Sequence, residues 1–389
     1  MDATADTLYV DTPAALERLC VQIDGQPWLA LDTEFLREKT YFPQLCLVQI
    51  ATPQLTACVD PLALADLGPL LDVLYRPTIL KVLHASRQDL EIFHHLRGAP
   101  FAPVFDTQLA APLLGHPDQV GYAALVAAVL GVNLSKSHTR ADWRRRPLPP
   151  EQLRYAADDV RYLAPLYQRL NTDLAGRGRL DWLADEFTAL SDPGQYENPP
   201  EQAWHRVRGA DRLRGPRLAV LQDLAAWRES TARAEDQPRA WLLRDETLLD
   251  LARMMPQTEQ DLRHLRGLNE RVAQRHGADL VMRIRAAAQQ VPRPAETARP
   301  HPPRLEPSAE ALADLLMAVV RARAQQHQLS PATLAPRKEV ERLVAGEDHS
   351  VLLKGWRERM IGEELRSVLR GERHVSVVDG ELLVSPAGP

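Results

Sequence analysis

The stretch that decides the fold is "WLALDTEFL", residues 28–36, in which an apolar run that predicts a buried strand carries two carboxylates, Asp32 and Glu34. Residues two apart on a strand point to the same face of a sheet, so the two acids converge on one spot. A buried pair of like charges is costly unless a positive group lies between them, and a divalent cation is the natural occupant. On this motif alone an alternative stays open, in which the strand ends at Leu31 and the acids are solvated loop residues.

Further strand and helix signals surround this stretch. Bounded apolar runs predict strands, and capped periodic runs predict helices, one beginning after Thr12 and one after Ser86. The expected strands are 45–51, 56–59 and 79–83, and the expected helices are 13–23, 87–96, 107–115, 121–131 and 151–174. Successive strands followed by alternating strands and helices indicate an α/β fold, a mixed sheet with helices on both faces.

The length of 389 residues exceeds what a single hydrophobic core supports, so several domains are expected. We predict an α/β domain over residues 1–195, which the polar, Pro-rich stretch 191–202 brings to its end. A helical domain follows over 203–290. A linker with six prolines spans 291–307, and a second helical domain spans 308–380, closing on a hairpin turned at Asp379-Gly380.

Composition excludes several classes of protein. Hydrophobic residues make up 45% of the chain and charged residues 25%, without an apolar run long enough for a membrane span. The N-terminus lacks the features of a signal peptide, so we expect a cytoplasmic protein with reduced cysteines and no membrane contact. We also expect a monomer. Residues 1–200 hold 17 Lys and Arg against 25 acids, whereas 204–290 hold 16 Arg against 12 acids. This asymmetry favours a basic portion that approaches phosphates, although an uneven scatter of surface charge is the alternative.

Three more residues complete a possible catalytic constellation. "KVLHASRQDLEIF" (81–93) predicts a strand running into a helix, with Asp89 in the first turns of that helix. "EQLRYAADDVRYL" (151–163) places Tyr155 and Asp159 four apart on one helical face. Each motif is weak alone, because a single helical Asp is more often a surface residue or a cap. Together with the pair at 32 and 34, four carboxylates from three segments suit two hard cations, Mg²⁺ or Mn²⁺.

The motifs "DTEF", "LHASRQDLEIF" and "YAADDVRYL" resemble, in order, the three exonuclease motifs of the DEDD superfamily, in its tyrosine-bearing branch. The stretches "TYFPQLCLVQ" and "SHTRADWRRRPL" resemble the ribonuclease D family of that branch, and the two helical domains resemble HRDC domains. The resemblance implies a ribonuclease H-like exonuclease domain. It also implies that Asp32, Glu34, Asp89 and Asp159 bind the metals, while Tyr155 orients the attacking water.

Two-metal hydrolysis at phosphorus needs no protein nucleophile, in keeping with a sequence that lacks nucleophile-elbow, phosphate-loop and zinc-protease motifs. The resemblance therefore implies a metal-dependent 3'-to-5' exoribonuclease that releases nucleoside 5'-monophosphates. Its partner would be structured RNA with a free 3' end, with precursor tRNA as the substrate class of the family. A DNA exonuclease of proofreading or repair type is the alternative, because the acids do not distinguish RNA from DNA. An inactive RNA-binding adaptor is a second alternative, disfavoured because all five motif positions are occupied.

Five further residues are candidate substrate contacts. Phe35 and Tyr41 would stack on terminal bases, although ordinary packing explains them equally well. His84 precedes the Asp89 helix and would lie near the metals, unless it is a histidine satisfied within the core. Lys136 and Arg140 would touch substrate phosphates, with a solvated basic face as the alternative.

Other conspicuous residues have structural interpretations. The run Arg144 to Arg146 is either a set of phosphate contacts or a solvated face. Asp106 is expected to be a helix cap. Trp227, Trp241 and Trp356, in helical patterns, are expected in the cores of their bundles.

Overall fold

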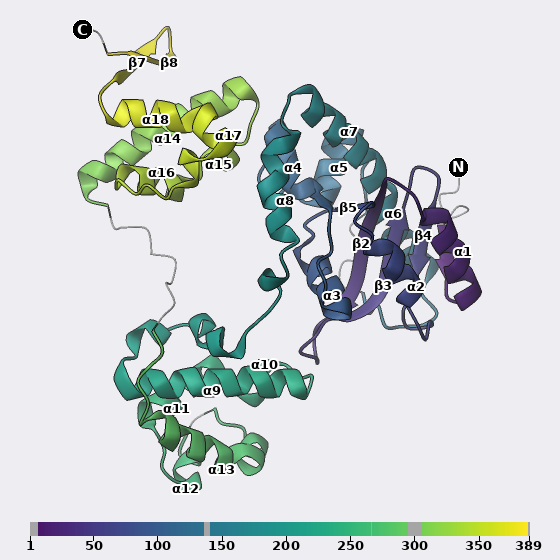
Figure 1. Cartoon of the computed structure of the whole chain (residues 1–389), viewed down its shortest axis with the longest axis vertical. Helices are drawn as coiled ribbons and strands as arrows, with labels where there is room; N and C mark the ends of the chain where they lie inside the picture. Colours follow the sequence, from purple (N-terminus) through teal and green to yellow (C-terminus); the bar gives the residue numbers. More distant parts are fainter. Residues whose placement is uncertain (1–6, 136–140, 266, 295–304, 388–389) are drawn as a thin grey trace.

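The computed structural model describes residues 7–135, 141–265, 267–294 and 305–387. It shows an α/β part followed by two helical modules (Figure 1). The candidates Lys136 and Arg140 lie outside the described residues. No helix in the described ranges is long and apolar enough to cross a bilayer.

The α/β part is built on a six-stranded mixed sheet with the order β1-β4-β3-β2-β5-β6. The strands are β1 Thr7–Val10, β2 Trp28–Leu36, β3 Gln44–Ala51, β4 Thr56–Val59, β5 Leu80–Leu83 and β6 Val104–Asp106. Strand β3 is antiparallel to both β2 and β4, whereas the other pairs are parallel. Strand β2 continues through Asp32 and Glu34, so the alternative in which the acids follow the strand in a loop is wrong. The short strands β1 and β6 were not predicted from the sequence.

Helices cover both faces of this sheet, which confirms the α/β prediction. Helices α1, α2 and α3 enclose one apolar core with the sheet, and α6 and α7 cover the opposite face. The helices are α1 Pro13–Ile23, α2 Gly68–Leu74, α3 Arg87–Arg97, α4 Thr107–Ala110, α5 Tyr122–Leu130, α6 Pro150–Arg161, α7 Leu163–Gly176 and α8 Ala184–Leu190.

Two local predictions about these helices are wrong. The single helix expected over 151–174 is divided at Tyr162, where α6 ends and α7 begins. The division lets α6 contact β2, β3 and β4 while α7 also contacts β5. Ser86 does not cap α3, because its hydroxyl donates instead to Asp106 at 2.8 Å. Thr12 does cap α1, and Asp106 caps α4, as expected.

The first helical module has a core of its own around Trp204 and Trp227. Its α-helices are α9 Gly215–Ala234, α10 Arg239–Leu242, α11 Asp245–Met254, α12 Glu259–Leu262 and α13 Glu270–Ala287. Trp227 is buried as predicted, but the core position predicted for Trp241 is wrong, because this side chain is 52% exposed.

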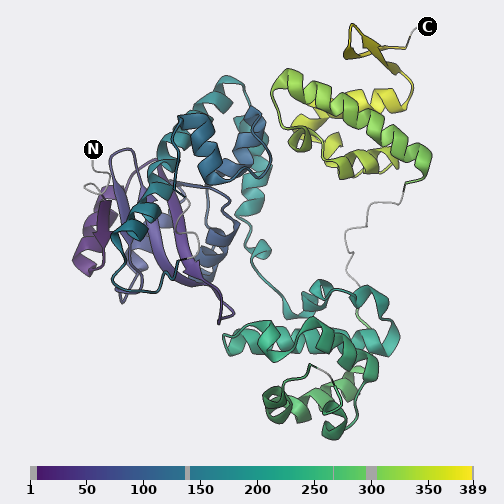
Figure 2. The same ribbon diagram turned by 180° about the vertical axis from the view of Figure 1, so that it is seen from behind.

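The second helical module ends in a two-stranded hairpin. Its elements are α14 Pro307–His327, α15 Pro331–Leu334, α16 Arg337–Val344, α17 Gly355–Arg357, α18 Glu363–Leu369, β7 Arg373–Val378 and β8 Glu381–Pro386. It lies beside the α7 and α8 side of the α/β part (Figures 1 and 2). There Trp356 stacks on Trp182 at 4.5 Å, and Arg179 donates to the carbonyl oxygen of His327 at 2.7 Å.

Candidate active site

The sheet and two helices bring the predicted acids together. Carboxylate oxygens of Asp32 and Glu34 on β2 and Asp159 on α6 all lie within 4.8 Å of one another. Asp89, in the first turn of α3, accepts a hydrogen bond from the hydroxyl of Thr33, the residue between the two β2 acids. We refer to Asp32, Glu34, Asp89 and Asp159 as the acidic cluster.

The carboxylates of the acidic cluster repel one another. Burial, followed by the neighbouring carboxylates, raises the pKa of Asp32 far above its ordinary value and that of Glu34 to about 9. Burial likewise raises the pKa of Asp89 and of Asp159. The charged groups that act on Asp32 and Glu34 are all carboxylates. Converging hard oxygen donors with no cationic side chain among these neighbours are the ligand set that Mg²⁺ and Mn²⁺ prefer, so the residues fit a divalent metal site.

Tyr155 lies one turn before Asp159 on α6, and the two side chains are hydrogen-bonded. Burial, followed by the charge of Asp159, raises the pKa of Tyr155 above its ordinary value. The phenol therefore keeps its proton at neutral pH and acts there as a donor. Trp143 packs near the ring, with 6.2 Å between ring centroids.

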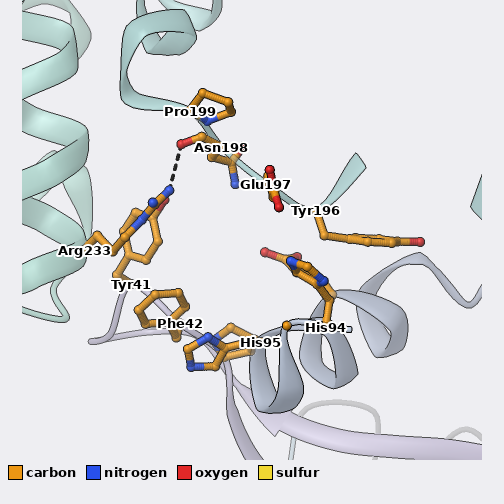
Figure 3. Close-up of a pocket in the computed structure, with 12 residues that line it drawn as sticks. Tyr41, Phe42, His94, His95, Tyr196, Glu197, Asn198, Pro199 and Arg233 are labelled. Atoms are coloured by element: carbon orange, nitrogen blue, oxygen red, sulfur yellow. Dashed lines mark hydrogen bonds between the residues drawn. The ribbon is translucent and has the colours of Figure 1, made fainter. Parts of the chain in front are cut away.

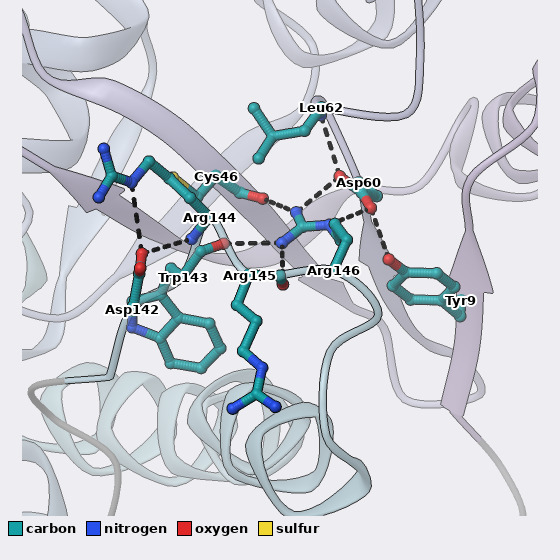
Figure 4. Close-up of polar contacts among 9 residues, drawn as sticks. All are labelled: Tyr9, Cys46, Asp60, Leu62, Asp142, Trp143, Arg144, Arg145 and Arg146. Atoms are coloured by element: carbon teal, nitrogen blue, oxygen red, sulfur yellow. Dashed lines mark hydrogen bonds and ion pairs between the residues drawn. The ribbon is translucent and has the colours of Figure 1, made fainter.

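The segment that leads into α6 is clamped to the sheet by Arg146 (Figure 4). Its guanidinium donates to both carboxylate oxygens of Asp60, at 2.5 and 2.7 Å, and to the carbonyl of Cys46 at 2.7 Å. The Tyr9 hydroxyl also donates to Asp60, at 2.5 Å. Arg146 is therefore a structural anchor in this structure and not a free phosphate ligand. Asp60 was not predicted as a functional residue, because its only signal in the sequence is an acid directly after a buried strand.

The described secondary candidates Phe35 and His84 both have contacts within the protein. Phe35 packs against the core on the face of the sheet that α1, α2 and α3 cover. Both ring nitrogens of His84 have protein partners, the Thr107 hydroxyl at 2.9 Å and the Val120 carbonyl at 3.1 Å.

Tyr41 belongs to a contact between the α/β part and the first helical module. Its hydroxyl donates to Glu229 on α9, a side chain only 1% exposed, and the Tyr41 and Phe42 amides donate to Asp236. Figure 3 shows Arg233 of α9 beside the Tyr41 ring and bonded to the Asn198 carbonyl, at 2.7 Å. The loop between β2 and β3 is thus an anchor for the first module.

Comparisons with known proteins agree with this architecture. A family model described as 3'-5' exonuclease matches residues 8–175, and the HRDC domain model matches 217–284. Ribonuclease D of Nitrobacter hamburgensis is 37% identical over 378 residues, covering 96% of this chain and 98% of its own. That of Sphingobium indicum is 39% identical over 371 residues, covering 94% and 95%. The crystal structure of Escherichia coli RNase D, described as an exoribonuclease involved in structured RNA processing, superposes with a TM-score of 0.79 at 32% identity, over 94% of this chain and 99% of its own.

Proposed function

The chain belongs to the ribonuclease D family of 3'-to-5' exoribonucleases, and from that premise we propose that it trims the 3' ends of structured RNA, precursor tRNA included. It releases nucleoside 5'-monophosphates one at a time and works as a monomer in the cytoplasm. The observation that supports the proposal most directly is the convergence of Asp32, Glu34 and Asp159 within 4.8 Å inside the region that matches the exonuclease model.

In this proposal the acidic cluster holds two divalent cations, Mg²⁺ or Mn²⁺. When bound, the cations supply Lewis-acid stabilisation of the reacting phosphate and acidify the attacking water. Asp32 receives repulsion from all three other acids of the cluster, so it would be the carboxylate that the cations relieve most. Tyr155 orients the water as a hydrogen-bond donor, since a phenol with a raised pKa is a poor general base at neutral pH.

The helical modules have a separate role in the proposal. The first module carries 16 Arg against 12 acids over 204–290, so it would hold the phosphates of the RNA body while the 3' end enters the α/β part. Binding should therefore weaken steeply as salt is raised.

The test uses the full chain with a 3'-tailed tRNA and a matched single-stranded DNA, each with Mn²⁺ and with chelator. We expect stepwise release of nucleoside 5'-monophosphates from the RNA, abolished by chelator and by Asp159→Asn. The matched control is Asp158→Asn, because Asp158 is the neighbouring acid and pairs with Arg161 at 2.9 Å outside the acidic cluster. This control should retain activity within about twofold, since an ion pair one helical turn apart, with both side chains about a quarter exposed, contributes little.

Three results would contradict parts of the proposal. Internal cleavage products would exclude the exonucleolytic reaction, and turnover in chelator would exclude the metal role of the acidic cluster. Faster degradation of the DNA than of the RNA would show that the substrate is DNA and not RNA.

A further inference from the structure

Trp241 is the anomalous aromatic residue of the first helical module. All seven tryptophans lie within the described residues, and Trp241 is the only exposed one, at 52%. Half of a large indole left in water is an unused hydrophobic and stacking surface. An exposed aromatic surface indicates a binding site when the residues around it also suit a ligand.

The surroundings of Trp241 are basic. The indole lines a cavity of about 730 Å³ together with Arg244, Arg271 and Arg275. Arg275 pairs with Glu235 at 2.9 Å, whereas Arg244 and Arg271 have no carboxylate partner among the described residues. An exposed ring beside unpaired guanidinium groups matches an unpaired nucleotide, whose base stacks while its phosphate is neutralised.

The cavity also points toward the α/β part. It shares Ala240 and Arg244 with a second cavity of about 630 Å³, which is lined in addition by Arg37, Thr40 and Tyr41. Arg37 comes three residues after Glu34 of the acidic cluster, directly beyond the end of β2. A single-stranded RNA that passes over Trp241 would therefore reach the loop after β2, the strand that carries Asp32 and Glu34.

We propose that Trp241 is a stacking platform for unpaired nucleotides of the RNA substrate, with Arg244 and Arg271 as its phosphate contacts. The proposal rests on the proposed function and names the place where the first module holds the RNA. Since stacking does not depend on base identity, the platform should tolerate any sequence.

The test compares Trp241→Ala with Trp241→Phe on two substrates, a tRNA with a long 3' tail and a 4-nucleotide RNA that enters the α/β part alone. We expect Trp241→Ala to raise KM for the tailed tRNA about 5- to 150-fold, the equivalent of about 1–3 kcal/mol for one stacked base. Trp241→Phe should stay near wild type. Met254→Ala is the matched control, because Met254 is 56% exposed on the same module.

Turnover of the 4-nucleotide RNA distinguishes the Trp241 platform from the proposed function. Its turnover should be equal in all variants, because it does not reach the platform. Unchanged KM of Trp241→Ala on the tailed tRNA would overturn the proposal while leaving the proposed function intact. Equal loss on both substrates would also overturn it, in favour of a structural role. Failure of the wild-type chain on both RNAs would instead overturn the proposed function, and the platform with it.

A different observation concerns Gln49 on β3, which is fully buried yet has no hydrogen-bond partner for its amide nitrogen or oxygen among the described residues. Gln49 is the direct cross-strand partner of Asp32 in the antiparallel β2–β3 pair, so the two side chains share the face of the sheet that α6 covers. An unpaired buried amide costs about 1–3 kcal/mol. Carboxylates that bind metals are usually themselves held by hydrogen bonds from neighbouring groups.

We infer that Gln49 is a positioning residue for Asp32: its amide, which has no partner in the described part of this structure, donates to that carboxylate when the site holds its cations. This inference also rests on the proposed metal site. Gln49→Leu should weaken Mn²⁺ binding about 10- to 100-fold in calorimetry. It should leave the melting temperature of the chelated protein unchanged or raise it, because an unsatisfied amide is removed.

Cys58→Ala is the matched control, since Cys58 is the other cross-strand neighbour of Gln49. It should lower the melting temperature without changing Mn²⁺ affinity. A destabilised Gln49→Leu variant with wild-type Mn²⁺ affinity would overturn the inference. Absence of Mn²⁺ binding by the wild-type chain would overturn the metal assignment and the inference together.

Discussion

Replacing Asp60 by asparagine tests the clamp that holds the segment before α6. The Asp60 side chain is 2% exposed and the Arg146 side chain 24% exposed. Asparagine keeps one acceptor oxygen but loses the one that accepts from Arg146 Nε and from the Tyr9 hydroxyl. Both lost bonds end on a carboxylate oxygen, and a hydrogen bond to a charged group contributes about 1.5–3 kcal/mol. We reduce the sum of about 3–6 kcal/mol to an expected loss of about 2–4 kcal/mol, because the retained oxygen still accepts from Arg146 and water reaches that side chain.

Urea unfolding at pH 7 measures this loss, which corresponds to a fall of about 5–15 °C in melting temperature for a domain of this size. The matched control is Asp142→Asn, because Asp142 pairs with Arg144 in the same segment at 3.3 Å, with both side chains exposed. That variant should unfold at nearly the same urea concentration as the wild type, because water screens an exposed pair. A loss below about 1 kcal/mol for Asp60→Asn would show that the Arg146 clamp does not stabilise the fold.

The difference in unfolding free energy between wild type and Asp60→Asn should depend on pH. Burial alone would raise the pKa of Asp60, but the hydrogen bonds from Arg146 and Tyr9 outweigh it and lower that pKa below its ordinary value. An acid with a lowered folded-state pKa contributes stability above its unfolded pKa of about 3.9, and loses it as the pH falls through the folded value. The gap in unfolding free energy between wild type and Asp60→Asn should be constant from pH 8 to 5 and close below about pH 4. Closure near neutral pH would point to another group.

Three further predictions concern the acidic cluster and the module contacts. The carboxyls of the acidic cluster have raised pKa values, so the folded protein without metal holds protons that the unfolded chain releases. The melting temperature of the chelated protein should therefore fall as the pH rises from 6 to 9, and added Mn²⁺ should reverse this fall. Tyr41→Phe removes the hydroxyl bond to buried Glu229 and should speed limited proteolysis within 191–202 without changing turnover of a 4-nucleotide RNA. Trp356→Ala removes the stack on Trp182 and should cost about 3–5 kcal/mol in urea unfolding, again with the short RNA still hydrolysed.

Local sequence patterns predicted the central part of the fold well. The apolar run at 28–31 and the period-two spacing of Asp32 and Glu34 indicated a strand with both acids on one face, and β2 has this form. The pair Tyr155 and Asp159 is likewise a spacing of one helical turn. These features depend on residues close in sequence, so periodicity alone carries them. The one-residue break at Tyr162 did not interrupt that periodicity, and the expected helix was therefore too long.

Contacts between distant residues could not be predicted in this way. Asp60 and Arg146 are 86 residues apart, and Tyr41 and Glu229 are 188 apart. The sequence around Tyr41 does not show whether its ring stacks on a base or holds another module. The opposite error occurred at Trp241, whose place in a helical pattern predicted a core position that the fold gives to Leu242 instead. Tyr41, which seemed suited to bind RNA, is held by Glu229, and Trp241, which seemed structural, is exposed. Both differences arise from how residues distant in sequence pack together, whereas the motifs that define the chemistry are local.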